Sequence, residues 1–390
     1  MPRRFNVQRQ EHILFNNCAP SLRHLNVSFP LYFPPVTSWL GGLTALYLRA
    51  FPESLSWILN LLRRVPQLET LNLYQLNTST SPPSDNAAVE ARHTLLPISM
   101  MSLRDFRVSF NSLDILIALL SLMRFQEDVL HKCYVECGTG YEQVNAVQAS
   151  YLSALPLLMH DLFRQVLPRG AGKTPFGIHL NLDLDHINIR ASDEEYNRFG
   201  EHIGPFFTFS LRSTNPPFST AVLAGLWRSL SRLNMSNISS LQLWFTYCAV
   251  CETDLEICLA LHAFISQLSN LQTLLIVDAS LHAVHFIHEG IRHDLRILPS
   301  LKTVRFRYNF PNIQELDAFL CRRREIGLPI EKLVLPSLCD MNSNQLDYTC
   351  LENQPGMKVV WEDLNEPREY ICGSGSPDVL HFETKRAAVA

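Results

Sequence analysis

The chain lacks the features that most directly reveal a function. It has no excess of basic residues, since its formal net charge is -4 at pH 7, and nucleic-acid binding usually depends on clustered lysine and arginine. No apolar run approaches the roughly 20 residues of a membrane-spanning helix, and none resembles a signal peptide. The ten cysteines follow no regular spacing. We therefore expect no nucleic-acid or membrane partner, and a cytoplasmic or nuclear location with reduced thiols.

One stretch, GAGKT at residues 170–174, invites comparison with a phosphate-binding P-loop. A P-loop needs a further glycine where this chain has Leu167, a strand before the loop and a helix after it. Here the apolar residues of 152–163 recur with helical spacing, with a kink expected at Pro156, and strict alternation begins near Phe176. The order is therefore reversed, and we expect a turn between a helix and a strand with no bound nucleotide cofactor.

Two groups of potential metal ligands also lack the spacing of a metal-binding site. Cys248 and Cys251 have the spacing of half a zinc site, but no second pair lies nearby in the sequence. The histidines between His282 and His293 lack the His-Glu-x-x-His spacing that places two ligands on one helix face. No acid, base and nucleophile occur in a recognisable pattern. The sequence therefore predicts no metal, no cofactor and no enzyme activity.

A short repeated unit is the main signal in the sequence. It consists of a leucine, two residues, an apolar residue, one residue and a second apolar residue, as in PQLETLNLYQL. Its eight copies are Leu22-Leu25-Val27, Leu43-Leu46-Leu48, Leu68-Leu71-Leu73, Leu103-Phe106-Val108, Ile238-Leu241-Leu243, Leu271-Leu274-Ile276, Leu301-Val304-Phe306 and Ile330-Leu333-Leu335. Each copy predicts a buried turn followed by a short strand with alternate side chains in the core.

Apolar residues with helical spacing lie between several copies, for example Leu55-Ile58-Leu59-Leu62. A unit of one strand and one helix cannot bury its own apolar face, so the copies must stack. The predicted fold is α/β, an irregular leucine-rich-repeat solenoid, or horseshoe, with a parallel sheet on the concave face and helices on the convex face.

The predicted organisation has one large domain. Residues 1–17 form an N-terminal segment, 18–365 the repeat domain with an irregular middle at 125–235, and 366–390 a flexible C-terminal tail. In the middle, Ser192 and Glu195 have the spacing of a helix capping box. The basic run at 322–324 follows apolar residues at helical spacing, which predicts a solvated helix end.

Several stretches resemble the leucine-rich-repeat region of fungal F-box-like proteins. They are PSLRHLNVSF, WLGGLTALYLR, VPQLETLNLYQL and FLCRRREIGLPIEKLVLP, with VVWED further on. The resemblance covers most of 18–365 and is weakest at about 125–235. It implies a target-binding role in ubiquitination, in which an F-box segment docks on the adaptor of a cullin-type ligase. Only about twenty residues precede Leu22, so we expect adaptor binding only if an F-box lies upstream.

The residues between the buried strand positions should face the concave side, where repeat proteins usually bind. The predicted partner-binding residues are Tyr47, Arg49, Asn72, Tyr74, Arg107, Gln242, Trp244, Arg305 and Arg307. Leu275 and Val277 occupy equivalent positions and indicate that another element packs there. The predicted function is recognition of an unidentified protein target. The alternatives are an enzyme or ligand-binding protein that uses the central insertion, and a truncated copy without function.

Overall fold

The structure is a computed structural model of the whole chain. It describes residues 18–28, 37–49, 55–74, 96–111, 113–126, 129–138, 155–164, 176–182, 186–193, 207–212, 218–245, 255–277, 297–307, 311–337, 345–363 and 366–383. In this described part the fold is mixed α/β, and the main sheet has 14 strands and is mostly parallel. The chain divides into two compact units, residues 1–168 with 211–215, and residues 169–210 with 216–390.

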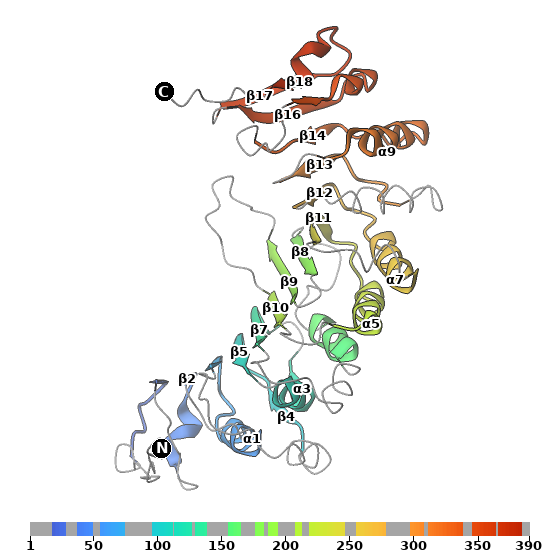
Figure 1. Cartoon of the computed structure of the whole chain (residues 1–390). Coiled ribbons are helices and arrows are strands. Elements are labelled where there is room, and N and C mark those ends of the chain that lie inside the picture. The colour runs from blue at the N-terminus through green and yellow to red at the C-terminus, as the bar shows by residue number, and fades with distance from the viewer. Residues whose placement is uncertain are drawn as a thin grey trace, which may run out of the picture. The chain divides into compact units, whose positions relative to one another are not determined.

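Unit 1 contains four of the eight predicted repeat copies. Its elements are β1 (His24–Val27), the 3-10 helix η2 (Ser38–Gly42), β2 (Ala45–Arg49), α1 (Leu55–Arg63), β3 (Thr70–Tyr74), β4 (Ile98–Met100), β5 (Asp105–Phe110), α3 (Leu113–Leu122), β6 (Met123–Phe125), β7 (Lys132–Gly138) and a helix at 155–164. The strands β1, β2, β3, β5 and β7 pair in this order and in parallel. Figure 1 shows α1 and α3 together beside these strands.

Unit 2 contains the other four copies. Its elements are β8 (Phe176–Leu182), β9 (His186–Asp193), α5 (Thr220–Ser231), β11 (Ile238–Phe245), α7 (Leu255–Ser266), β12 (Thr273–Ile276), β13 (Thr303–Phe306), α9 (Ile313–Glu325), β14 (Lys332–Val334), β15 (Gln345–Asp347), η4 (Thr349–Asn353), β16 (Lys358–Asp363), β17 (Glu366–Ile371), η5 (Pro377–Leu380) and β18 (His381–Glu383). The boundary between the units divides β10 (Phe207–Arg212). In unit 2 the strand order is β9-β8-β11-β12-β13-β14-β16-β17.

The repeated unit has a repeated backbone structure. Before most strands, the first apolar residue is buried in a turn and donates its backbone N–H to the carbonyl three residues earlier. The turn bonds are Leu43 to Leu40, Leu68 to Val65, Leu103 to Met100, Ile238 to Met235, Leu271 to Leu268 and Leu301 to Leu298, at 3.1 to 3.4 Å. Consecutive turns are also linked, since the carbonyls of Arg23, Thr44, Glu69 and Arg104 each accept two N–H groups from the start of the next strand. The predicted buried turn is therefore confirmed.

The strand cores follow the predicted alternation. The inward residues are Leu25 and Val27, Leu46 and Leu48, Leu71 and Leu73, Phe106 and Val108, Leu241 and Leu243, Leu274 and Ile276, Val304 and Phe306, and Leu333 and Leu335, all at most 7% exposed. The parallel register aligns them, as in the row Leu25, Leu46, Leu71 and Phe106. Helices complete the core of each unit, and in unit 2 the rings of Trp227 on α5 and Phe264 on α7 lie 5.1 Å apart.

The irregular middle differs from the prediction at strand β9. Ser192 lies in strand β9, so it does not begin a helix; β9 pairs antiparallel with β8, with Ile187, Ile189 and Ala191 buried. The sheet is therefore not wholly parallel. The helix predicted around Pro156 is present at 155–164, but the residues before it lie outside the described ranges, so the kink expected at Pro156 stays a prediction. The strands predicted at Phe176 and Phe207 are present as β8 and β10.

The C-terminal segment also differs from the predicted flexible tail of 366–390. Strand β17 pairs antiparallel with β16, and β18 pairs antiparallel with β15. Leu380 and Phe382 are buried, and the Phe382 ring lies 5.2 Å from that of Trp361. An antiparallel edge strand carries few apolar residues, because only one of its faces needs burial. This explains why EPREYI looked like a solvated tail in the sequence.

The basic run at the end of α9 requires another correction. Arg323 is fully buried, and its guanidinium donates to the carbonyl oxygens of Ile297 and Leu298 through Nη1 (3.1 and 3.0 Å) and of Leu301 through Nη2 (3.0 Å). The helix then ends in a Schellman motif, with Gly327 at φ 77°. Only part of the run is solvated, because Arg323 fixes the turn of the preceding repeat.

Candidate functional site

The face of the sheet opposite the buried rows is the strongest candidate for a functional surface. Successive side chains of a strand point to opposite faces, so each strand that buries two apolar residues presents the intervening residues on the other side. In a parallel register these residues align across neighbouring strands. We call this surface the sheet face, and describe it in each unit separately.

The sheet face of unit 1 has two rows of aligned polar and aromatic residues. The first row is Asn26, Tyr47, Asn72, Arg107 and Tyr134, and the second is Arg49, Tyr74, Ser109 and Glu136. Arg49 is exposed, and the other members of the second row are half-buried. All five residues predicted for this part of the chain therefore share one surface.

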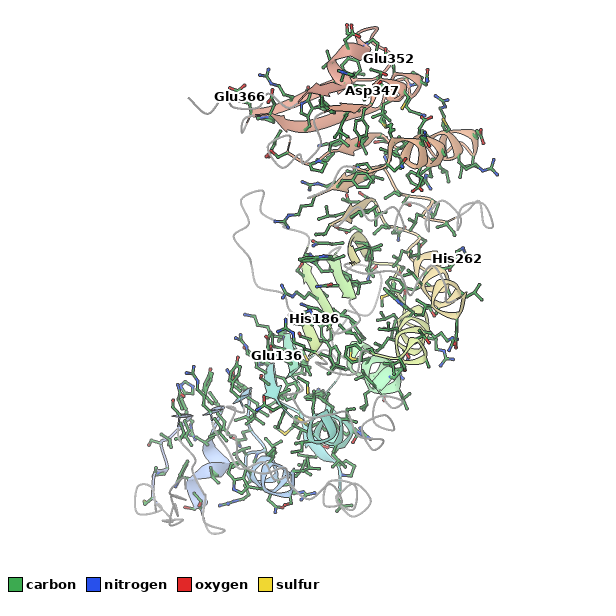
Figure 2. All side chains as sticks on the ribbon, in the orientation of Figure 1. Glu136, His186, His262, Asp347, Glu352 and Glu366 are labelled. Atoms are coloured by element: carbon green, nitrogen blue, oxygen red, sulfur yellow. The ribbon has the colours of Figure 1, made fainter. Side chains whose placement is uncertain are left out.

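Two charges of this face, on Arg107 and Asp105, are paired with each other. Arg107 donates to both carboxylate oxygens of Asp105, at 3.0 Å from Nε and 3.2 Å from Nη2. This hydrogen bond raises the pKa of Arg107, with a further contribution from the charge of Asp105 and only partial opposition from burial. On the next strand, β7, Glu136 accepts hydrogen bonds at the same oxygen from Tyr134 of that strand (3.0 Å) and from Ser109 of β5 (3.4 Å). Glu136 is labelled on β7 in Figure 2.

One polar atom in the centre of this face has no partner. The side-chain oxygen of Asn72 is buried and accepts no hydrogen bond in the described part of the chain. It lies in the row between Tyr47 and Arg107. An unsatisfied buried acceptor is unfavourable, so this oxygen destabilises the fold locally.

The sheet face of unit 2 is built in the same way. One row consists of Arg190, His179, Gln242, Leu275, Arg305 and Val334, and a second of Gly177, Ser240, Thr273, Thr303, Lys332 and Lys358. Trp244 is half-buried and aligns with Asn181. Arg305 and Arg307 are exposed. The four residues predicted for this part of the chain thus lie on the sheet face of unit 2.

The predicted burial at Leu275 and Val277 holds in part. Val277 is 1% exposed, whereas Leu275 is only half-buried. The backbone N–H of Val277 bonds the carbonyl of Leu243, which continues the contact between the two strands. The segments that follow both strands lie outside the described residues.

Tyr134, Glu136 and Lys332 are among the residues of these surfaces that were not predicted from the sequence. Tyr134 and Glu136 belong to β7, whose sequence KCYVECG buries Cys133, Val135 and Cys137. The alternation of this strand was visible, but the leading leucine of the repeat was absent. Lys332 lies between buried Leu333 and the turn of the eighth copy, and its exposed position follows from the same alternation.

The C-terminal part of unit 2 contains one further polar cluster. Tyr370 donates to Glu352 at 2.6 Å, and the backbone N–H of Gly375 donates to the other carboxylate oxygen at 2.7 Å. These hydrogen bonds, led by that of Tyr370, lower the pKa of Glu352. Glu352 is labelled in Figure 2. The cluster joins η4 to the turn after β17, so we assign it a structural role.

The structure does not reach the stretches that resembled chemical motifs. Residues 170–174, Cys248 with Cys251, and the histidines between His282 and His293 lie outside the described ranges. Within those ranges no three histidine, cysteine or acidic side chains are grouped so that they could hold a metal ion. None of the helices that the structure describes is long and apolar enough to cross a membrane. The absence of nucleotide and zinc binding therefore stays a prediction.

Comparison with known proteins does not assign the chain to a family. No protein-family model matches the chain, and no curated protein matches it.

Proposed function

We propose that this chain is a non-enzymatic protein-recognition module built as an irregular leucine-rich-repeat solenoid. The observation that supports it best is the alignment of tyrosine, tryptophan, asparagine and arginine side chains in rows across parallel strands. The linked turns of successive repeats also support a stacked arrangement.

The composition of the sheet face suits protein binding. Tyrosine and tryptophan bury large areas and lose few torsional freedoms, and arginine forms planar bidentate contacts with carboxylates. In unit 1, Tyr74 and Tyr134 lie on the two strands beside that of the positively charged Arg107, and Tyr47 lies two strands away in the same row. The resemblance to F-box-like repeats supports a narrower proposal, in which the bound protein is a target for ubiquitination.

Site-specific photocrosslinking tests the general proposal. A photoreactive phenylalanine analogue would replace Tyr74 or Trp244 on the sheet face in the full chain, expressed in its source cells. Matched control positions are Asn60 on α1 and Gln267 after α7, which are both exposed on the helical side of their units. We expect protein adducts from the two sheet-face positions only, since the partner would contact them directly.

Two results would decide against the proposal. Adducts from the control positions alone would place the binding surface on the helices. If all four positions gave no adduct, while each variant kept the melting temperature of the natural chain, the sheet face would have no protein partner in those cells. The triple substitution of Tyr74, Trp244 and Arg305 by alanine should abolish the adducts formed from an unchanged position such as Tyr47.

A further inference from the structure

Within the described ranges, the sheet face of unit 2 from β9 to β14 has charges of one sign. Its rows contain Arg190, Arg305, Arg307 and Lys332, and no aspartate or glutamate occupies these rows in the described residues. The chain as a whole has an excess of acidic residues, with a net charge of -4. The positive charge of this face is therefore a local feature that opposes the overall charge. We infer that it binds an acidic, extended segment of a partner protein.

Two cations of this face, on β13 and β14, are not neutralised by the described part of the chain. Arg305 and Lys332 form no ion pair and no side-chain hydrogen bond there, and both are exposed. They lie on neighbouring strands, because Thr303 pairs with Lys332 and Arg305 follows Thr303 by two residues. Adjacent strands are about 4.8 Å apart and each residue advances about 3.3 Å. A single carboxylate can thus approach both side chains.

The positive region ends where carboxylates begin. Lys358 on β16 is bound to Glu369 of β17 at 2.5 Å, and Lys302, in the turn before β13, is bound to Glu331 at 3.0 Å. Both pairs lie at the borders of the region. Arg305 and Lys332, which have no partner in the described residues, therefore define the area in which a negative ligand would be attracted, and the paired Lys302 and Lys358 lie beside it.

The residues among the cations favour a protein segment over a nucleic acid. Leu275 and Val334 share the row of Arg305, and Trp244 and Gln242 lie two strands away. Apolar side chains match the side chains of a peptide, whereas a phosphate backbone requires a longer stripe of cations. An extended peptide repeats its side chains on one face about every 6.6 Å, which is also the spacing of alternate residues along each strand of the sheet.

This inference rests on the proposed function and specifies its ligand. The test measures fluorescence anisotropy of the full chain with a labelled peptide of about ten residues that alternates glutamate with threonine. We expect binding that weakens as NaCl rises from about 0.05 to about 0.5 M, and no binding of the glutamine-threonine peptide. Arg305→Glu combined with Lys332→Glu should lower the affinity about tenfold or more.

The control is a double charge reversal of equal size elsewhere. Arg104 and Arg232 are exposed and lie outside the face of unit 2, so Arg104→Glu with Arg232→Glu should change the affinity less than about twofold. If the first variant unfolds, Arg305→Gln with Lys332→Gln replaces it, because both glutamines keep the chain length while removing the charge. A melting curve of each variant shows that it is folded.

Three outcomes would overturn the inference. These are equal binding of the glutamine peptide, equal loss in both double variants, and stronger binding of single-stranded DNA of the same length than of the acidic peptide. Any of these together with crosslinking at Tyr74 and Trp244 would leave the protein-recognition proposal standing. If the acidic peptide did not bind and no crosslink formed at Tyr74 or Trp244, the proposed function and the inference would both be rejected.

Discussion

The two units use the same buried rows but treat arginine in different ways. In unit 1, Arg107 on the sheet face is held by both oxygens of Asp105. In unit 2, Arg305 on the equivalent face has no carboxylate partner in the described residues, while Arg323 is buried on the helical side against three carbonyl oxygens. The buried apolar rows are the same in both units and define the repeated strand and turn. The environment of each arginine determines whether it contributes to stability or to binding.

This difference gives each arginine a separate expected role. A buried guanidinium that satisfies backbone carbonyls supports the fold, because its removal leaves acceptors without donors. A surface pair contributes little to stability. An exposed cation without a partner contributes almost nothing to stability and is the one best placed to attract a ligand.

The largest effect is expected from Arg323→Ala. The substitution removes donors to the carbonyls of Ile297, Leu298 and Leu301 and leaves a cavity, so we expect a loss of about 3–5 kcal/mol in the free energy of unfolding. Leu298 has φ 53°, a conformation that those bonds help to hold. Urea unfolding followed by circular dichroism measures the loss.

The matched control is the neighbouring Arg322, which is partly exposed and bonds Glu325 at 2.9 Å. Arg322→Ala should cost less than about 1 kcal/mol. Arg323→Lys keeps the charge but loses the planar guanidinium. Its loss in the free energy of unfolding should lie between those of Arg322→Ala and Arg323→Ala. Equal effects of Arg322→Ala and Arg323→Ala would show that Arg323 does not hold the turn.

This arginine also illustrates the limit of prediction from sequence. The apolar alternation predicted which residues enter the core, since burial of one face of a strand follows from periodicity alone. Three consecutive arginines at a helix end resemble a solvated terminus, although the helical spacing from Leu316 and Leu320 places the middle one on the buried face of α9. Its acceptors lie 22 to 26 residues earlier in the chain, so its burial depends on how the repeats stack.

For the candidate site, the alternation of the strands likewise predicted which residues lie on the sheet face but not how their side chains pair. The positions of Tyr74, Trp244 and Arg305 on the sheet face follow from the alternation around Leu73, Leu243 and Val304. The pairing of Arg107 with Asp105 does not, because a spacing of two residues on one strand allows the pair without requiring it. The antiparallel strand β9 was missed although its Ile187 and Ile189 alternate, because Ser192 with Glu195 resembled a helix start.

The second prediction concerns pH and compares buried and half-buried thiols in the two units. Burial raises the pKa of Cys133 in unit 1, and raises the pKa of Cys350 to about 11 and of Cys372 to about 12 in unit 2. Unfolded thiols ionise near pH 8.5. Above that pH the unfolded chain loses protons that the folded chain keeps, so stability should fall as pH rises from about 8.5 towards 11.

Melting temperatures measured between about pH 7.5 and 10.5 test this dependence. Cys372→Ala should flatten the decline, because it removes one group whose pKa changes on unfolding, and Cys133→Ala should do the same for unit 1. Cys18→Ala is the control, since Cys18 is exposed, and its slope should match that of the natural chain. A melting temperature that stays constant with pH would contradict the burial of these thiols.

The smallest effect is expected for the surface pair of unit 1, and it bears most directly on the comparison between the two faces. The side chains of Arg107 and Asp105 are 42% and 23% exposed, so a double-mutant cycle with Arg107→Gln and Asp105→Asn should give a coupling energy of about 0.5 kcal/mol. Arg305→Gln in unit 2 should change stability by less than that amount, because no described carboxylate loses a partner. A coupling energy near zero would mean that Arg107 is as available to a ligand as Arg305, and the acidic peptide should then bind both faces. A coupling energy near the expected value would instead explain a preference for unit 2, since a ligand carboxylate at Arg107 must first displace Asp105.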